Sequence, residues 1–125
     1  MGMREKSILL VEDNRDIQVF VGTIARLEGA NLRIAASGEE ALQLLDARVH
    51  FDLILLDLNL PGVSGWDVLS RARSAPESDD TPVVVFSAHI DAATRERAQA
   101  LGASGFLLKP IGAREFVEAI NAFLG

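Results

Sequence analysis

Polar side chains able to do chemistry stand directly after four short apolar runs of this 125-residue chain. The side chains in question are Glu12, Asp13, Asp57, Ser87 and Lys109. Carboxylates gathered within about 4 to 5 Å of one another repel by roughly 3 to 4 kcal/mol per pair at an effective dielectric near 20. A hard divalent cation such as Mg²⁺ offsets that cost, because it binds carboxylate, water and phosphate oxygens. With a lysine and a hydroxyl beside the acids, the set predicts a site for a phosphorylated oxyanion.

The chemistry that this set favours is transfer of a phosphoryl group onto Asp57. A carboxylate can act as a nucleophile and form an acyl phosphate. Lys109 and Mg²⁺ are expected to neutralise charge on the transferring group, and Ser87 to donate a hydrogen bond to a phosphoryl oxygen. The small Ala88 next to it leaves room for a bulky donor.

The elements that position these residues form a repeating pattern of strand and helix. Strands are expected over residues 7–11, 31–36, 52–56, 83–86 and 105–108, and helices over residues 16–28, 37–48, 91–101 and 113–124. Such alternation is typical of a parallel sheet with helices on both faces. The second strand is less apolar and is expected at an edge. Right-handed crossovers then favour a flavodoxin-like, doubly wound (βα)5 fold of class α/β, with strand order 2-1-3-4-5.

Parallel strands place all their carboxyl ends at one edge of the sheet, where such folds bind ligands. The five polar side chains are therefore expected to converge. The helix over residues 91–101 is expected to be loosely held, since Ala98 and Leu101 are its main apolar anchors. Arg95 and Arg97 are interpreted as part of a solvated helix face, and Trp66 as a packing residue.

Composition limits the remaining possibilities. The length fits a single domain over residues 1–125, with residues 1–6 as a poorly ordered lead-in. No apolar run approaches the ~18 residues of a membrane span, and the absence of cysteine fits a reducing compartment. A net charge of −6 without basic runs argues against direct binding of nucleic acid. A cytoplasmic protein that does not insert into membranes is expected.

Four segments of the chain together carry a family resemblance: LLVEDN, DLILLDLNLPGVSG, VVVFSAH and GASGFLLKP. In this order and spacing they resemble the receiver domain of two-component response regulators, the CheY-like family, over about residues 6–124. The resemblance implies that Asp57 is the phosphoacceptor and that Asp13 and Asp57 coordinate Mg²⁺. Glu12 would join through water and Asn59 through its backbone carbonyl, and the peptide bond before Pro110 would be cis.

The resemblance also implies how the domain signals. Ser87 would move toward the phosphate while Phe106, which lacks the hydroxyl of the commoner tyrosine, turns inward. His89 stands where receivers vary and where a side chain can influence the attacking water. The expected donor is a histidine kinase or a histidine phosphotransfer protein. The expected output is docking of a downstream protein on the fourth helix, fifth strand and fifth helix, so the chain is interpreted as a phosphorylation-activated switch and not as a turnover enzyme.

Three other functions are weighed against this interpretation. A Mg²⁺-dependent phosphatase of the haloacid dehalogenase type also uses a strand-end aspartate, but it needs a second acid where this chain has Asn59. A flavodoxin-like FMN carrier is disfavoured because Glu12 and Asp13 occupy the place of its phosphate loop. A receiver used only as an unphosphorylated interaction module is the third alternative, and no residue of the sequence favours it.

Overall fold

The computed structural model describes residues 2–125 and has the predicted architecture. Five parallel strands lie in the order β2-β1-β3-β4-β5. The strands are β1 (Ser7–Val11), β2 (Asn31–Ala35), β3 (Leu53–Leu56), β4 (Val83–Ser87) and β5 (Gly105–Leu108). The helices are α1 (Arg15–Glu28), α2 (Gly38–Asp46), α3 (Gly65–Ser74), α4 (Ala92–Ala100) and α5 (Ala113–Leu124). The α/β fold and its strand order are thus confirmed, and α3 is the one helix whose position the sequence did not indicate.

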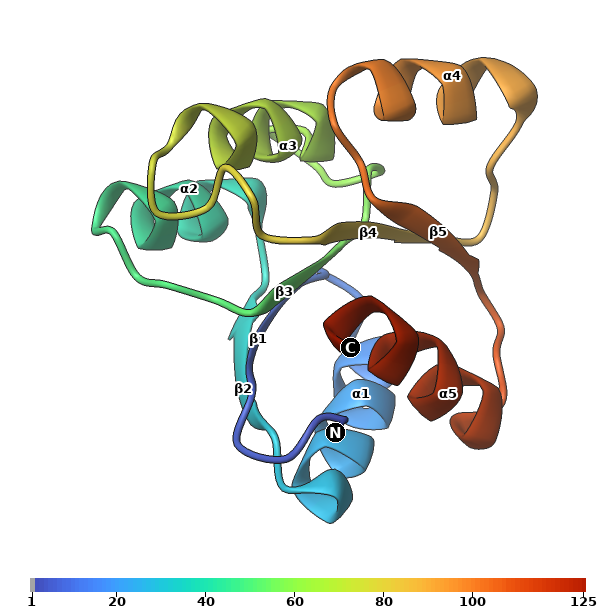
Figure 1. The fold of residues 1–125 in the computed structure, drawn as a ribbon. Coiled ribbons are helices and arrows are strands. Elements are labelled where there is room, and N and C mark those ends of the chain that lie inside the picture. The colour runs from blue at the N-terminus through green and yellow to red at the C-terminus, as the bar shows by residue number, and fades with distance from the viewer. Residues whose placement is uncertain (1) are drawn as a thin grey trace.

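The sheet separates two hydrophobic clusters, one on each face. Helices α1 and α5 cover one face, and α2, α3 and α4 cover the other (Figure 1). Successive side chains of a strand point to opposite faces. Leu9 of β1 accordingly belongs to the cluster under α2 to α4, whereas Leu10 belongs to the cluster under α1 and α5. The inner strands β1, β3 and β4 are apolar except for Ser7 and Ser87 at their ends, since both of their faces are covered.

Short polar side chains begin the helices that lead away from the functional edge of the sheet. Asn14 accepts a hydrogen bond from the Ile17 N–H at the start of α1, and Asp91 accepts one from the Thr94 N–H at the start of α4. The second of these bonds lowers the pKa of the Asp91 carboxyl. Such caps satisfy backbone donors that have no partner within the helix. They therefore define where the loops at the sheet edge end.

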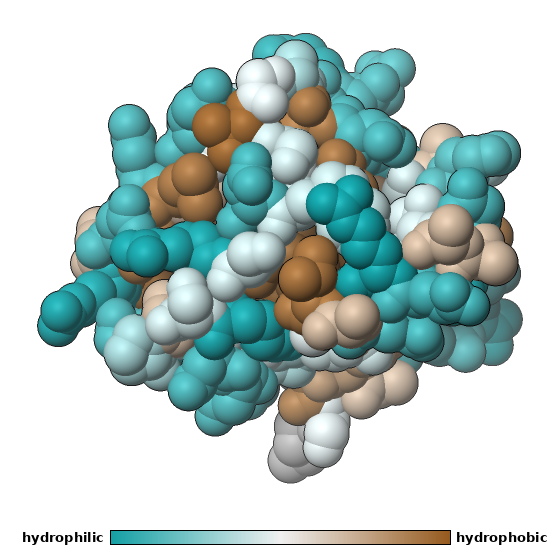
Figure 2. Space-filling model, turned by 90° about the horizontal axis from the view of Figure 1, so that it is seen from above, coloured by the Kyte–Doolittle hydropathy of each residue, from teal (hydrophilic) through white to brown (hydrophobic). Residues whose placement is uncertain are grey.

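Helix α4 is held to the fold more weakly than its neighbours, as predicted. Ala98 is its only buried residue, whereas α3 buries four. The face of the molecule that α2, α3 and α4 form is mainly hydrophilic, with only small separate apolar areas (Figure 2). Since the buried apolar area sets most of the packing free energy, α4 has little of it.

The first described residues pack onto the fold. The side chain of Met3 is buried in the cluster under α1 and α5, and the Glu5 N–H donates to the Gly29 carbonyl at 2.8 Å. The division into a single domain with a loosely ordered lead-in over residues 1–6 stays a prediction. Within residues 2–125, no helix combines the length and apolar character needed to cross a membrane.

Arg73, near the end of α3, joins two loops that are distant in the sequence. Burial lowers the pKa of its guanidinium from the ordinary value. The guanidinium donates to one hydroxyl and four backbone carbonyls: Ser104 Oγ and the carbonyls of Ser78, Asp79, Thr81 and Gly102. The Ser104 hydroxyl in turn accepts from the Val83 N–H at 3.1 Å. The segments entering β4 and β5 are therefore tied to α3 by a single side chain.

Replacing Arg73 with methionine is expected to lower the free energy of unfolding by about 2 to 3 kcal/mol, because partly buried carbonyls lose their donors. Arg71→Met is a matched control on the same helix, since Arg71 makes a surface ion pair with Asp46. That control should cost less than about 1 kcal/mol. Urea unfolding of both variants measures the difference. Equal losses would show that the Arg73 network adds no stability beyond that of a surface arginine.

Candidate functional site

Four of the predicted site residues lie at the carboxyl edge of the sheet, at the ends of four neighbouring strands. The last residues of β1 and β3 are register partners, so Glu12 and Asp57 leave neighbouring strands at the same level. Ser87 ends β4, and Lys109 follows β5, whose last residue is the register partner of Ser87. Parallel pairing thus brings residues almost 100 positions apart into one site.

Lys109 connects the two buried carboxylates. Its ammonium nitrogen lies 2.5 Å from Glu12 Oε1 and 3.3 Å from Asp57 Oδ2. Only 13% of the Lys109 side chain is exposed, so solvent screens these contacts less than it screens surface ion pairs. The lysine therefore holds both acids in place and cancels one negative charge between them.

Glu12 is the most buried acid of the site, with 1% of its surface exposed. Burial raises the pKa of its carboxyl, and the hydrogen bond from Lys109 offsets part of that shift. The other carboxylate oxygen accepts from the Asn14 N–H at 3.2 Å. The amide of Gln18 donates to the Glu12 carbonyl at 2.7 Å. Glu12 is thus held by contacts from its own loop, from α1 and from the lysine that follows β5.

The acidic group has the donor chemistry of a hard-cation site. One carboxylate oxygen each from Glu12, Asp13 and Asp57 lies within 4.8 Å of the others. Asp13 is exposed and Asp57 is buried, with its Oδ1 accepting from the Asn59 N–H at 2.9 Å. Because Glu12 is already paired with Lys109, its carboxylate is less available as a direct ligand than those of Asp13 and Asp57. The residues therefore fit Mg²⁺, with Glu12 in a supporting role.

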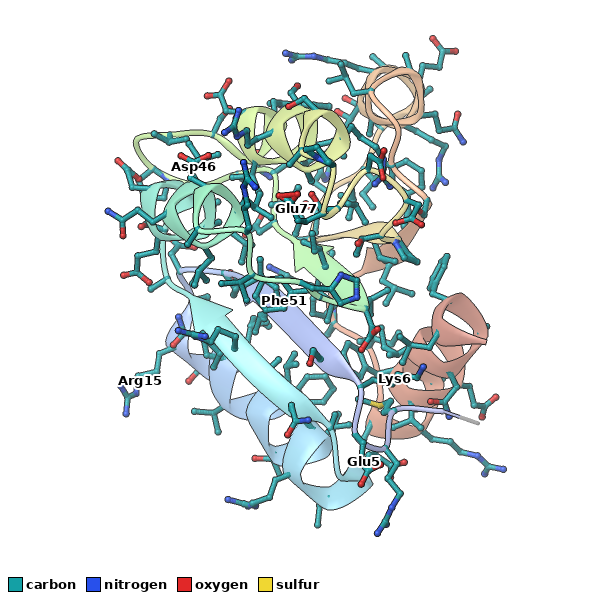
Figure 3. The ribbon with its side chains drawn as sticks, turned by 60° about the vertical axis from the view of Figure 1, so that its left-hand side comes forward. Glu5, Lys6, Arg15, Asp46, Phe51 and Glu77 are labelled. Carbon is teal, nitrogen blue, oxygen red and sulfur yellow. The ribbon has the colours of Figure 1, made fainter. Side chains whose placement is uncertain are left out.

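No arginine neutralises the cluster from α1. Arg15 is exposed, and its side chain points away from the molecule (Figure 3). Three acids and Lys109 leave the site with two formal negative charges when all four groups are ionised. This excess attracts a cation and repels an anion that arrives without one.

Ser87 and its neighbours occupy the loop between β4 and α4. The Ser87 hydroxyl donates to the His89 carbonyl at 3.2 Å and also lies 3.4 Å from the His89 N–H. Ser87 is buried, whereas Ala88 and His89 are exposed. In this structure the hydroxyl is therefore bonded to its own loop, and the predicted bond to a phosphoryl oxygen would require it to turn.

Phe106 and Pro110 flank Lys109 in the sequence. The ring of Phe106 is half-buried against the cluster under α2 to α4. Pro110 is exposed, and the peptide bond between Lys109 and Pro110 is cis, as the resemblance implied. The switch role of Phe106 and the accessory roles of Ala88, His89 and Pro110 stay predictions.

Two residues that support the site were not identified from the sequence. The ring centroid of Phe86 lies 5.3 Å from the Lys109 nitrogen, within the range of a cation–π contact. A side chain at Gly65 would collide with the backbone of Asp57 and Leu58, so only glycine lets α3 begin this close to the site. Gly65 follows Ser64, the N-cap of α3. In the sequence, this close approach of α3 to the loop after β3 could have been inferred only from the pair Ser64–Gly65, a typical N-cap residue followed by glycine.

Comparison with known proteins assigns the chain to a family. Residues 8–121 match the response regulator receiver domain family. The chain belongs to this family, whose members are phosphorylation-dependent signalling switches and not classical substrate-turnover enzymes.

Individual relatives and solved structures agree with that assignment. The chain is 38% identical over 117 residues to the transcriptional regulatory protein CpxR of Escherichia coli, covering 94% of this chain and 48% of CpxR. It therefore spans about half the length of that relative. It is 35% identical over 121 residues to the polar-differentiation response regulator DivK of Brucella ovis, covering 96% and 97% of the two chains. A similar solved structure is the receiver domain of the sensor histidine kinase PA1611 of Pseudomonas aeruginosa, which has a magnesium ion coordinated in its active-site cleft. The two structures superpose with a TM-score of 0.87 at 26% sequence identity, over 97% of this chain and 98% of the PA1611 chain.

Replacing Lys109 with methionine removes the ammonium and keeps an apolar stem. The free energy of unfolding at pH 7 should fall by about 3 kcal/mol, because the Glu12 carboxylate is left buried without its partner. Its pKa in the folded variant should then lie further above the ordinary value of 4.5. A raised folded-state pKa favours folding at low pH, and this advantage is lost as the pH rises through that pKa. The stability deficit should therefore widen between pH 5 and pH 7.

Urea unfolding of the wild type and Lys109→Met at both pH values measures this effect. The double variant Glu12→Gln, Lys109→Met is the control, because it removes the buried charge together with its partner. Its deficit should be smaller and should not widen between pH 5 and pH 7. A single variant whose deficit is the same at pH 5 and pH 7 would contradict the assigned role of Lys109.

Proposed function

We propose that Asp57 of this receiver domain accepts a phosphoryl group in a Mg²⁺-dependent reaction, and that the modified domain changes its affinity for a partner protein. The observation that carries the proposal is the placement of the Lys109 ammonium 3.3 Å from Asp57 Oδ2. An ammonium at that distance stabilises negative charge that develops beside the nucleophilic carboxylate. An aspartate that only capped a helix would not require a buried ammonium beside its carboxylate.

Each residue of the site is expected to have a separate role in phosphoryl transfer. One oxygen of Asp57 would form the new P–O bond as the P–N bond to the donor histidine breaks and its imidazole leaves. The other oxygen is held by the Asn59 N–H, so the carboxylate is already oriented. Lys109 lies opposite and is expected to contact a phosphoryl oxygen once the acyl phosphate has formed. Ser87, which ends the strand between β3 and β5, is expected to donate a second hydrogen bond after leaving its bonds to His89.

Asp13 and Asp57 are expected to hold Mg²⁺ directly, with the Asn59 carbonyl as a further ligand and Glu12 linked through water. The bound ion would neutralise charge on the carboxylates and on the phosphoryl group. Support comes from the three carboxylate oxygens within 4.8 Å of one another. The structurally similar PA1611 receiver, which holds magnesium in its active-site cleft, gives independent support.

The expected donor is a histidine kinase or a histidine phosphotransfer protein, and the expected readout surface consists of α4, β5 and α5. The weak attachment of α4 supports this choice, because an element that buries one alanine can move at low cost in free energy. Leu108 of β5 is 55% exposed and offers apolar area on the same surface. The haloacid-dehalogenase-type alternative has less support, since Asn59 offers no acid to protonate a leaving group.

Incubation with acetyl phosphate, with and without Mg²⁺, tests the proposal by intact mass. The wild type should gain one phosphoryl group in the presence of Mg²⁺ and much less without it, and Asp57→Asn should gain none. Asp52→Asn is a matched control, because Asp52 precedes the opposite end of β3 and its carboxylate binds the Ser7 N–H. That variant should be modified like the wild type. Equal modification of Asp57→Asn and the wild type would refute the assignment of Asp57.

A further inference from the structure

Two arginines of α4 stack on aromatic rings from other parts of the chain. The Arg95 guanidinium carbon lies 4.5 Å from the ring centroid of Phe106 in β5. The Arg97 guanidinium carbon lies 4.1 Å from the ring centroid of Trp66 in α3. Both distances fall within the range at which a cation is attracted to the face of a ring. We call these two contacts the arginine clamp.

The helical period places the two arginines on opposite sides of the buried residue of α4. Each residue advances about 100° around a helix. Ala98 therefore lies between Arg95 and Arg97 on the inner side, with one arginine reaching toward β5 and the other toward α3. The clamp therefore holds α4 from both sides of its only buried residue.

Both rings belong to segments that start or end at the phosphorylation site. Trp66 is the second residue of α3 and follows Gly65, which packs against the backbone of Asp57. Phe106 precedes Lys109 by three residues in the same strand and loop. A displacement of the loop after Asp57, or of the end of β5, therefore changes the geometry of one of the two contacts.

The start of α4 is connected to the site by a third route. Ser87 is bonded to the backbone of His89, and Asp91 caps α4 two residues later. If Ser87 turns to donate to a phosphoryl group on Asp57, it gives up its bonds to this loop. The loop and the first turn of α4 are then free to shift, and Arg95 lies one turn from the Asp91 cap.

We propose that the arginine clamp holds α4 in the position seen here, in which Ser87 bonds its own loop, and that it thereby opposes phosphorylation of Asp57. The coupling part of this proposal rests on the proposed function, whereas the mechanical part does not. Contacts that are better formed in one of two states favour that state by their difference in free energy. Loss of the clamp should therefore loosen α4 and raise the population of the conformation that accepts a phosphoryl group, which speeds the reaction in proportion.

Amide hydrogen exchange of the unphosphorylated protein tests the mechanical part. In Arg95→Gln and in Arg97→Gln, the amides of α4 should exchange about two- to fivefold faster than in the wild type, which is the factor expected for one cation–π contact at an exposed site. Arg114→Gln on α5 is the matched control, because Arg114 pairs with Glu118 and stacks on no ring in the described chain. Exchange of α4 at the wild-type rate in both clamp variants would overturn the proposal.

Phosphorylation by acetyl phosphate in Mg²⁺ tests the coupling. Both clamp variants should be modified about two- to fivefold faster than the wild type, and Arg114→Gln at the wild-type rate. Trp66, the single tryptophan, gives a second readout, because its emission in unphosphorylated Arg97→Gln should resemble that of the phosphorylated wild type. Faster exchange together with unchanged phosphorylation rates would overturn the coupling. A wild type that takes up no phosphoryl group would refute the proposed function and the coupling, while hydrogen exchange would still decide whether the clamp exists.

Discussion

The repulsion among three carboxylates at one edge of the sheet is the constraint around which this domain is organised. Glu12 and Asp57 are buried, Asp13 is exposed beside them, and one ammonium lies between the two buried groups. Separating these acids would relieve the repulsion, but the strands do not allow it. Neighbouring strands lie about 4.8 Å apart, and the residues that carry Glu12 and Asp57 follow register partners. The sheet therefore holds an excess of negative charge at this edge, and a bound cation or a proton would reduce the repulsion. The same excess makes this edge the candidate functional site.

The choice of lysine follows from distance. Lys109 comes from β5, two strands away from β3 and three from β1, so its backbone starts about 10 Å from that of Asp57. A long, unbranched side chain crosses the end of β4 and reaches both acids. Its ammonium nitrogen lies over the ring of Phe86, 5.3 Å from the centroid.

The parts of this structure that follow from local periodicity were predictable from the sequence, and those that depend on distant contacts were not. Alternating apolar runs and helical spacing predict the strands and helices, and the less apolar second strand with right-handed crossovers favours the strand order. Parallel strands then bring the polar ends to one edge. Arg95 and Arg97 show what a local pattern cannot predict, because their spacing indicates only an exposed helix face. Whether a ring lies beside each of them depends on how α3, α4 and β5 pack, and no local pattern records that. Arg73 is similar, since its partners are backbone carbonyls of two distant loops, which any sequence provides. The third helix was not located because its apolar residues follow a loop rich in proline, glycine and serine.

The unequal attachment of the helices has a thermodynamic consequence for signalling. To convert a 1:99 population of two states into 99:1, a modification must favour the second state by about 5.5 kcal/mol. If α4 were packed as firmly as α3, much of that free energy would be needed to detach it. A helix that buries one alanine and is otherwise held by arginines stacked on rings can be displaced through contacts that are individually weak. The apolar strands keep the acids fixed. Under the proposed function, a charge added at Asp57 would therefore act on the least firmly attached helix and not on the sheet. A switch of this kind needs both features: a rigid sheet edge that positions the reacting groups, and a weakly packed helix that can move in response.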